Sequence, residues 1–327
     1  MKAPLGAVAS RFGAVVNVLG LLVALALVLG AFQLLIEGKF DRDFVTWVNL
    51  QTIARQSTIV CLAALGMTFI IVSGAIDLSI GSAVALVTVV IAWCLRIGAD
   101  PVLALAAGAA AGALVGATNG LLVSRLRVGS FIVTLGTLLV FRGIAKGIAG
   151  EQKIDAPTTW LGDLLAMLPR EREWMVFPPG VWVMIAFAGL AALLLRQTRF
   201  GRHVVATGGN ELAAHYSGVP VSRVRLAVFA LGGFFAGLAG LMQFSRLTVG
   251  DPTVAVGLEL DVIAAVVIGG GSLSGGQGSI VGSLLGAVLM TTIRAGCSQY
   301  GLHNWVQEIV TGSIIVAAVG LDRLRRR

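Results

Sequence analysis

The sequence predicts an all-α polytopic membrane protein with about ten transmembrane helices, some of them broken or re-entrant. The chain has 327 residues, of which 57% are hydrophobic and only 12% are charged, whereas a soluble domain is about 25% charged. Apolar runs of about 20 residues, the length that crosses a bilayer, recur along the whole chain. Glycines and acids interrupt or bound some of these runs, which is typical of broken membrane helices.

Ten apolar segments follow one another, and each is expected to form a membrane helix. The first includes an apolar run from Val15 to Ile36, which is longer than the 7–15 residues of a signal-peptide core and therefore predicts a retained helix. The second, third and eighth segments are the expected sites of breaks. The segments are 14–36, 56–74, 78–96, 101–123, 129–149, 176–195, 224–245, 254–270, 279–296 and 303–321.

The distribution of charge predicts that both termini face the cytoplasm. With the N-terminus inside and ten spans, the inside segments hold thirteen Lys or Arg residues and three acids, as the positive-inside rule requires. The cations are Lys2, Arg11, Arg125, Arg127, Arg196, Arg199, Arg202, Arg223, Arg225, Arg323 and Arg325–Arg327, and the acids are Asp77, Glu211 and Asp322. The whole chain, 1–327, is then one transmembrane domain with an external loop at 150–178 and a basic cytoplasmic loop at 196–225.

Several other classes of function are disfavoured. The net charge of +8 lies in connections between apolar runs, so it indicates membrane topology rather than a nucleic-acid partner. The three cysteines form no CxxC pair, and the three histidines form no HxxxH motif, so no metal site is predicted. No GxSxG motif is present, and we expect no catalytic residues and no cofactor.

A glycine-rich segment, GGGSLSGGQGS (269–279), contains Gly270, Gly271, Ser272, Gly275 and Gly276. A nucleotide-binding loop would need a lysine, and none follows Lys153. We therefore expect a tight break between two spans, in which glycines permit positive φ and close helix approach. The segment weakly resembles IIVSGAIDLSIGSAVAL, also a Gly/Ser-rich break, and the echo reflects either a duplicated architecture or chance.

The segment NELAAHYSG (210–218) predicts a short helix in the cytoplasmic loop. Asn210 is a good N-cap, Glu211 suits the positive end of the helix, and Gly218 followed by Pro220 stops it. Ala213 and Ala214 favour helix between these ends. A helix this short is unstable alone, so it either docks a cytoplasmic partner or lies on the lipid headgroups.

Three ionisable residues in the later apolar segments admit two interpretations each. Glu259 and Asp261 are spaced by two and lie on different sides of a helix. They are expected at its outer, solvated flank rather than as a cooperating pair. Arg142 lies about 20 Å from the inner end of its span at 1.5 Å per residue. It either extends toward the outer surface or pairs with one of these acids.

Four long motifs carry a resemblance to a known family and together cover essentially the whole chain. They are GMTFIIVSGAIDLSIGS (66–82), RVGSFIVTLGTLLVFRG (127–143), TRFGRHVVATGGNELAAHYSGV (198–219) and LELDVIAAVVIGGGSLSGGQGSIVGSLLGA (258–287). In this order they resemble the permease subunit of ATP-binding-cassette (ABC) importers of the ribose/xylose/arabinose type. The resemblance implies a protein of the bacterial inner membrane that is not itself an enzyme.

The same resemblance implies the partners. Such permeases pair as homo- or heterodimers, a pair of cytoplasmic ATPases hydrolyses ATP, and a periplasmic binding protein delivers the monosaccharide. The short helix at 210–218 matches the family's EAA-like loop through Ala213, Ala214 and Gly218, which favours docking. The strict pattern has Glu immediately before the two alanines, whereas Leu212 intervenes here.

Asp77, in SGAIDLSIGS, raises the sharpest question, because a charge at mid-bilayer costs about 2.5–3.5 kcal/mol. We expect Asp77 or Ser79 to cap the helix that follows, and Gly81 to permit close packing. Direct contact with a sugar and coupling to an ion remain alternatives. The second would make the protein a secondary carrier, and within the ABC class the cargo could be a signalling furanone, a nucleoside or an amino acid.

Overall fold

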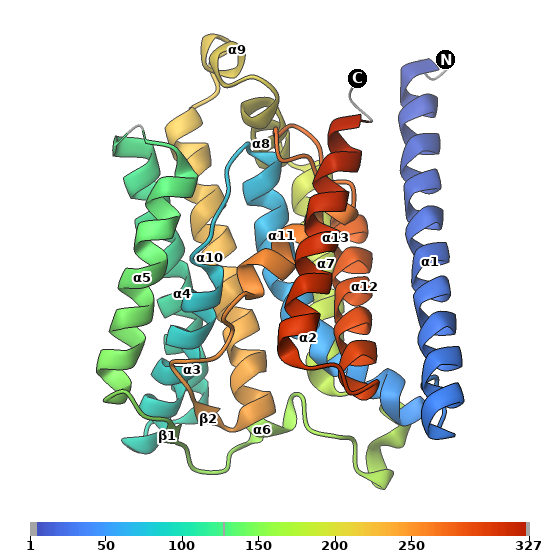
Figure 1. The fold of residues 1–327 in the computed structure, drawn as a ribbon. Coiled ribbons are helices and arrows are strands. Elements are labelled where there is room, and N and C mark those ends of the chain that lie inside the picture. The colour runs from blue at the N-terminus through green and yellow to red at the C-terminus, as the bar shows by residue number, and fades with distance from the viewer. Residues whose placement is uncertain (1–4, 127, 325–327) are drawn as a thin grey trace.

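The computed structural model describes the backbone of residues 5–126 and 128–324, and the side chains of 16–126, 128–169, 171–172 and 174–320. Over these residues the chain is almost entirely helical, and the long helices run between two opposite ends of the molecule (Figure 1). One end carries α9 with the start of α1 and the end of α13, and the other carries the strands β1 and β2. We call them the α9 end and the β end.

The elements follow the predicted order. The first half contains α1 (Leu5–Phe40), α2 (Trp47–Val72), α3 (Ile80–Arg96), α4 (Pro101–Leu126), α5 (Ser130–Ala149), β1 (Ile154–Asp155), α6 (Trp160–Asp163) and the 3-10 helix η1 (Arg170–Met175). The second half contains α7 (Pro179–Gln197), α8 (Arg199–Gly209), α9 (Glu211–Tyr216), α10 (Val221–Leu247), β2 (Val249–Gly250), α11 (Leu258–Ile268), α12 (Ile280–Gln299) and α13 (Asn304–Leu324).

Each of the ten apolar segments forms a helix at or near its expected place. Seven helices are long and apolar enough to cross a membrane within the described residues: α1, α2, α4, α5, α7, α10 and α12. Helix α3 has 17 residues and α11 has 11, so both are shorter than a full span. The number of ten spans therefore stays a prediction, and the two short helices are where breaks were expected.

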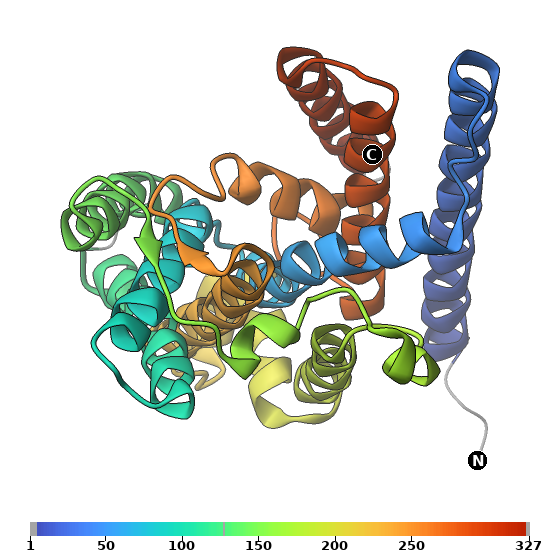
Figure 2. The same cartoon turned by 90° about the horizontal axis from the view of Figure 1, so that it is seen from below.

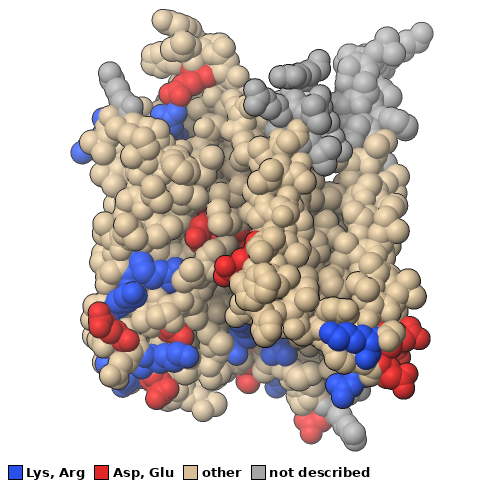
Figure 3. All heavy atoms as spheres, in the orientation of Figure 1, with Lys and Arg blue, Asp and Glu red and all other residues tan. Residues whose placement is uncertain are grey.

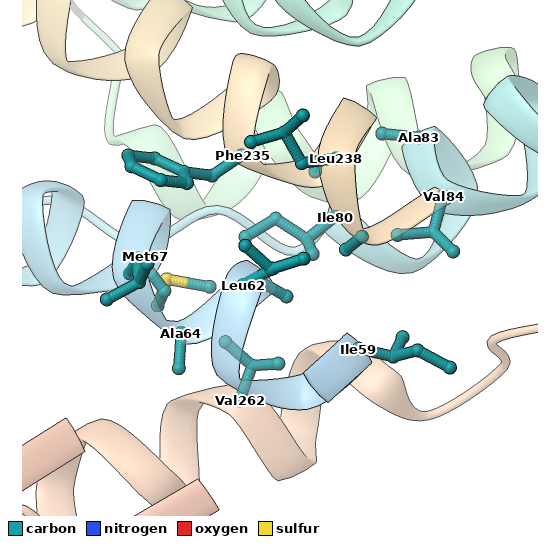
Figure 4. Close-up of a cluster of buried hydrophobic side chains, with 14 of the residues drawn as sticks. Ile59, Leu62, Ala64, Met67, Ile80, Ala83, Val84, Phe235, Leu238 and Val262 are labelled. Carbon is teal, nitrogen blue, oxygen red and sulfur yellow. The ribbon is translucent and has the colours of Figure 1, made fainter. Parts of the chain in front are cut away.

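Helix α2 forms the centre of the protein. Its most apolar window is 83% buried, against 11% for α1, as expected for a helix that is hydrophobic on all sides. Leu62 of α2 lies beside Ile80 of α3, while Val262 of α11 packs on another side of α2 (Figure 4). The core is thus built around α2, with the two short helices against it.

Helices α4 and α10 approach each other through glycines. Gly108, Gly112, Gly116 and Gly120 repeat every four residues along one face of α4. A Cβ atom on Gly112 would lie 2.6 Å from the Cα atom of Gly237 in α10, so no larger residue fits. This close packing is the small-residue pattern of membrane helix pairs.

Two stretches of the chain have the same order of elements in opposite directions. Helix α2 runs toward the α9 end, residues 73–79 turn back without helix, and the short α3 is followed by α4 and α5 (Figures 1 and 2). Helix α10 runs toward the β end, residues 251–257 turn back, and the short α11 is followed by α12 and α13. Helix α4 packs on α10, and α12 packs on α2. The counterpart of the 73–79 break is therefore 251–257, not the glycine-rich segment 269–279.

Candidate functional site

The two breaks meet inside the protein at Gly81, in the first turn of α3. A Cβ atom on Gly81 would overlap both the carbonyl oxygen of Ala255 and the Glu259 carboxylate. Because no side chain fits there, glycine allows the start of α3 to lie directly against the second break. The sequence singled out Gly81 for close packing, and the structure places it at this crossing.

Asp77 stabilises a turn directly before α3. Its Oδ1 atom accepts hydrogen bonds from the backbone N–H of Ser79 at 2.8 Å and from the Ser79 hydroxyl at 2.7 Å, and Asn119 of α4 donates to that hydroxyl oxygen at 2.7 Å. Ser79 occupies the N-cap position, but its side chain bonds none of the first-turn amides. The expected cap by Ser79 is therefore wrong, whereas the Asp77 carboxylate shapes the break through the turn that it forms with Ser79.

Asp251 forms the same turn at the second break. Its Oδ1 atom accepts from the Thr253 N–H at 2.8 Å and from the Thr253 hydroxyl at 2.6 Å, while Lys153 forms an ion pair with Oδ2 at 3.2 Å. Burial raises the pKa of Asp251, but the hydrogen bonds from Thr253 and Lys153 outweigh burial, so this pKa lies below its ordinary value. Sequence reasoning missed Asp251, although an Asp-x-Ser/Thr triplet stands at both breaks.

Arg142 holds the second break from α5. Its Nη1 atom donates to the carbonyl oxygens of Pro252 at 3.0 Å and Val254 at 2.6 Å. Among the described residues Arg142 forms no ion pair, so the expected pairing with Glu259 or Asp261 is wrong. An extended segment leaves carbonyl groups without helical partners, and inside a membrane these groups need a donor.

Glu259 and Asp261 do not lie on a solvated outer flank as expected. Helix α11 begins at Leu258 inside the protein, so both acids lie in its first turn, where Asp261 is buried and Glu259 is half-buried. Asp261 is 3% exposed and forms an ion pair with Arg294 of α12 at 2.7 Å, while the Glu259 Oε2 atom has no hydrogen-bond partner among the described residues. Figure 3 shows acidic atoms midway between the ends, in a hollow of this face, while most other charges gather at the β end.

A cavity of about 300 Å³ lies among α2, α10, α11 and α12. Within the described residues no cluster of His, Cys, Asp or Glu could hold a metal ion. Apart from Asp261, sequence reasoning singled out none of the polar residues of its lining, because they come from four segments that are far apart in the sequence. The polar lining consists of Gln56, Gln243, Arg246, Asp261, Thr291 and Arg294.

The glycine-rich segment forms the expected tight break between α11 and α12. Gly270, Gly275 and Gly276 adopt φ values of +91°, +85° and +75°, which favour glycine. Ser272 is buried, and its hydroxyl oxygen accepts from the Ser274 N–H at 3.2 Å. A Cβ atom on Gly271 would press against Val266. The local geometry therefore confirms a tight turn.

A glycine junction joins this break to α2 and α8, and we define it by Val72, Gly208 and Gly276. The Gly276 N–H donates to the Val72 carbonyl oxygen at 2.8 Å. A Cβ atom on Gly208, near the end of α8, would overlap that carbonyl oxygen and would lie 2.6 Å from the Gly276 nitrogen. The three segments thus meet backbone to backbone.

Helix α9 follows the glycine junction directly and forms as predicted. The Asn210 side chain accepts from the Ala213 N–H at 2.9 Å, and Gly218 ends the helix at φ +83°. Glu211 forms an ion pair with Arg225 of α10 at 2.7 Å. Ala214 is buried, whereas Leu212 and Tyr216 are 69% and 86% exposed. The helix thus presents apolar side chains outward from the α9 end.

Known proteins match this chain over most of its length. The family model described as branched-chain amino acid transport system/permease component matches residues 49–319. The ribose import permease protein RbsC of Escherichia coli strain K12 is 37% identical over 291 residues, covering 89% of this chain and 90% of the relative. RbsC of Bacillus subtilis strain 168 is 39% identical over 305 residues, covering 93% and 94%. The L-arabinose transport system permease protein AraH of Escherichia coli strain K12 is 32% identical over 316 residues, covering 97% and 93%. No solved structure matches the chain.

Proposed function

The chain belongs to the permease-component family of branched-chain amino acid transport systems, and we propose that it is the membrane-spanning subunit of an ABC importer for a monosaccharide. The family description names amino acids, but the relatives named above, which match about nine-tenths of the chain, are ribose and arabinose permeases. The polar cavity suits a hydroxyl-rich cargo, which supports a sugar over an amino acid, a nucleoside or a furanone.

The α9 end is the cytoplasmic end in this proposal, so the chain has both termini inside. All six tryptophans lie in segments at the β end: Trp47, Trp93, Trp160, Trp174, Trp182 and Trp305. At the α9 end, the described side chains include Arg125, Arg196, Arg199, Arg202, Arg223 and Arg225, while Lys2, Arg11, Arg127 and Arg323–Arg327 lie outside the described side chains. Short arginine-rich connections on one side support a cytoplasmic location. The loop 150–178 then faces the periplasm of a bacterial inner membrane.

Helix α9 is the observation that carries the proposal. A helix of six residues is unstable alone, yet it is capped at both ends and presents Leu212 and Tyr216 to solvent. This arrangement fits a docking helix that inserts into a cytoplasmic ATPase. ATP hydrolysis then takes place on that separate subunit. A second permease subunit, identical or related, and a periplasmic sugar-binding protein complete the importer.

Transport in this proposal requires the two breaks to move between an outward-open and an inward-open arrangement. ATP binding brings the two ATPases together and moves α9. Only Asn210 separates α9 from α8 in the sequence. The glycine junction passes this movement to the end of α2 and to the α11–α12 loop. The ATPase cycle thereby shifts the equilibrium between outward and inward access.

The test is to place a charge on α9. Leu212→Asp should abolish co-purification of the ATPase and ATP-dependent uptake of labelled ribose and arabinose, while insertion into the membrane persists because the side chain is exposed. Met167→Asp, at a 53% exposed residue of the 150–178 loop, is the control and should leave co-purification unchanged. Normal co-purification and uptake with Leu212→Asp would refute the assignment. Uptake that needs no ATPase and collapses with an uncoupler would indicate an ion-coupled carrier instead.

A further inference from the structure

We infer that the cavity among α2, α10, α11 and α12 is a binding subsite for one neutral monosaccharide within a single permease subunit. The inference rests on the proposed importer function and adds a place where the sugar is held during passage. The polar lining comes from residues near the β-end halves of α2, α10 and α12 and from the first turn of α11. In the proposed orientation the subsite lies in the outer half of the membrane.

Unpartnered polar side chains line the cavity. Gln243 is only 7% exposed, and it forms no hydrogen bond with any described residue. Gln56 and Arg246 also line the cavity without a hydrogen bond among the described side chains. The Gln243 amide therefore has a donor and an acceptor free for an occupant of the cavity.

The chemistry of the lining matches sugar hydroxyls. A hydroxyl group both donates and accepts, and an amide such as that of Gln56 or Gln243 offers both functions. Asp261 accepts, Arg294 donates, and the ion pair between them at 2.7 Å leaves the other carboxylate oxygen for a hydroxyl. The Thr291 hydroxyl donates to the Ala287 carbonyl oxygen at 2.8 Å, so its lone pairs remain as acceptors.

The apolar part of the wall and the volume select a single sugar ring. Ile59, Leu258 and Met290 line the cavity beside the polar groups and can pack against the C–H face of a sugar. The volume of about 300 Å³ lies at the lower end of the range of small-molecule pockets, about 300–1,000 Å³. We therefore expect a monosaccharide to fit and a disaccharide to be excluded.

The cavity also touches the second break, because Ala255 and Val256 belong to its wall. Ala255 is the residue whose carbonyl oxygen lies against Gly81 at the crossing of the two breaks. A sugar in the cavity is therefore close to the crossing of the two breaks at Gly81. Movement of the 251–257 segment changes the shape of the subsite, which links sugar release to that movement.

Cysteine protection tests the subsite on the assembled importer in membrane vesicles. Thr291→Cys is introduced together with Cys94→Ala, which removes the half-buried native thiol, and a small charged thiol reagent is added from the outside. Ribose or arabinose should slow labelling of the cysteine in a saturable way, and sucrose at the same osmolarity should not. Absence of saturation, equal slowing by sucrose, or better protection by the sugar acid ribonate would overturn the inference.

Two lining variants test the role of the amide. Gln243→Leu removes one or two hydrogen bonds at nearly constant volume and should raise the midpoint of protection about three- to tenfold. Leu289→Met, at a buried residue of α12 that does not line the cavity, should leave the midpoint unchanged. If Gln243→Leu impairs folding, Arg246→Gln at the exposed rim replaces it and should also raise the midpoint. Equal midpoints for the polar and apolar variants would overturn the inference.

ATPase activity separates this inference from the proposed function. The same complexes are assayed for stimulation of ATP hydrolysis by the sugar-loaded binding protein. Stimulation without saturable protection means that the subsite is wrong and the importer assignment stands. Saturable protection in a permease that binds no ATPase would support the subsite and refute the assignment.

Discussion

Gly208→Ala should uncouple α9 from the transmembrane breaks. A Cβ atom at Gly208 has no room, because it would overlap the Val72 carbonyl oxygen and lie 2.6 Å from the Gly276 nitrogen. Both obstacles are backbone atoms, so no side chain can rotate away. The substitution must push α8 away from the end of α2 and from the α11–α12 loop.

The neighbouring glycine offers a matched control. Gly209 lies in the same helix, and a Cβ atom there meets nothing within 4 Å. Replacing a helical glycine by alanine gains up to about 1 kcal/mol from helix propensity, and this gain is shared by both variants. Overpacking costs about 1–3 kcal/mol. Gly208→Ala should therefore be about 1–3 kcal/mol less stable than Gly209→Ala.

Two assays on purified importer in liposomes measure the effect. Thermal unfolding of the permease reports the stability difference between the two variants. Sugar uptake per ATP hydrolysed reports coupling, and we expect it to fall for Gly208→Ala and to stay normal for Gly209→Ala while both retain the ATPase. Equal stability and equal coupling of the two variants would refute the idea that the glycine junction transmits the movement of α9.

Three further substitutions test the other contacts. Arg142→Met removes two charged hydrogen bonds from the second break and should destabilise the protein by about 3 kcal/mol or more in thermal unfolding, whereas Lys146→Met, one turn later, should have little effect; similar melting of the two would contradict this role. Asn210→Ala should cost about 1 kcal/mol of α9 stability and weaken ATPase binding in a pull-down, and Asn210→Ser should restore it if the cap is the cause. Asp77→Asn should support uptake, because an amide oxygen accepts the same two hydrogen bonds, while Asp77→Leu should not; loss of uptake with Asp77→Asn would indicate that the charge itself is needed.

Local signals in the sequence predicted local structure well. The apolar runs located each long helix, because about 20 consecutive apolar residues predict a membrane helix without knowledge of the rest of the chain. The cap at Asn210 and the stop at Gly218 follow from interactions within a few residues. The tight turn at 269–279 was also visible, because positive φ favours glycine wherever it occurs.

Contacts between distant segments could not be predicted in the same way. The role of Arg142 depends on carbonyl groups 110 and 112 residues away, and no pattern near Arg142 indicates them. Asp261 and Arg294 are 33 residues apart, and their pairing depends on α11 beginning inside the protein rather than at its surface. Hydropathy marked 254–270 as one span, because residues 254–257 are apolar although they are not helical.

The structure gives the two breaks different supports, and this difference bears on how they move. The 251–257 break is held from the β end by side chains, since Arg142 binds its carbonyl groups and Lys153 binds Asp251. Side chains also hold the 73–79 break, since Asn119 binds Ser79 and the hydroxyl groups of Ser130 and Thr134 bind the backbone of Ile76. This break differs in that it begins beside the glycine junction at the α9 end, where the contacts are between backbone atoms. In the proposed importer we therefore expect movement of α9 to reach the 73–79 break through the glycine junction, and to reach the 251–257 break through the contact at Gly81.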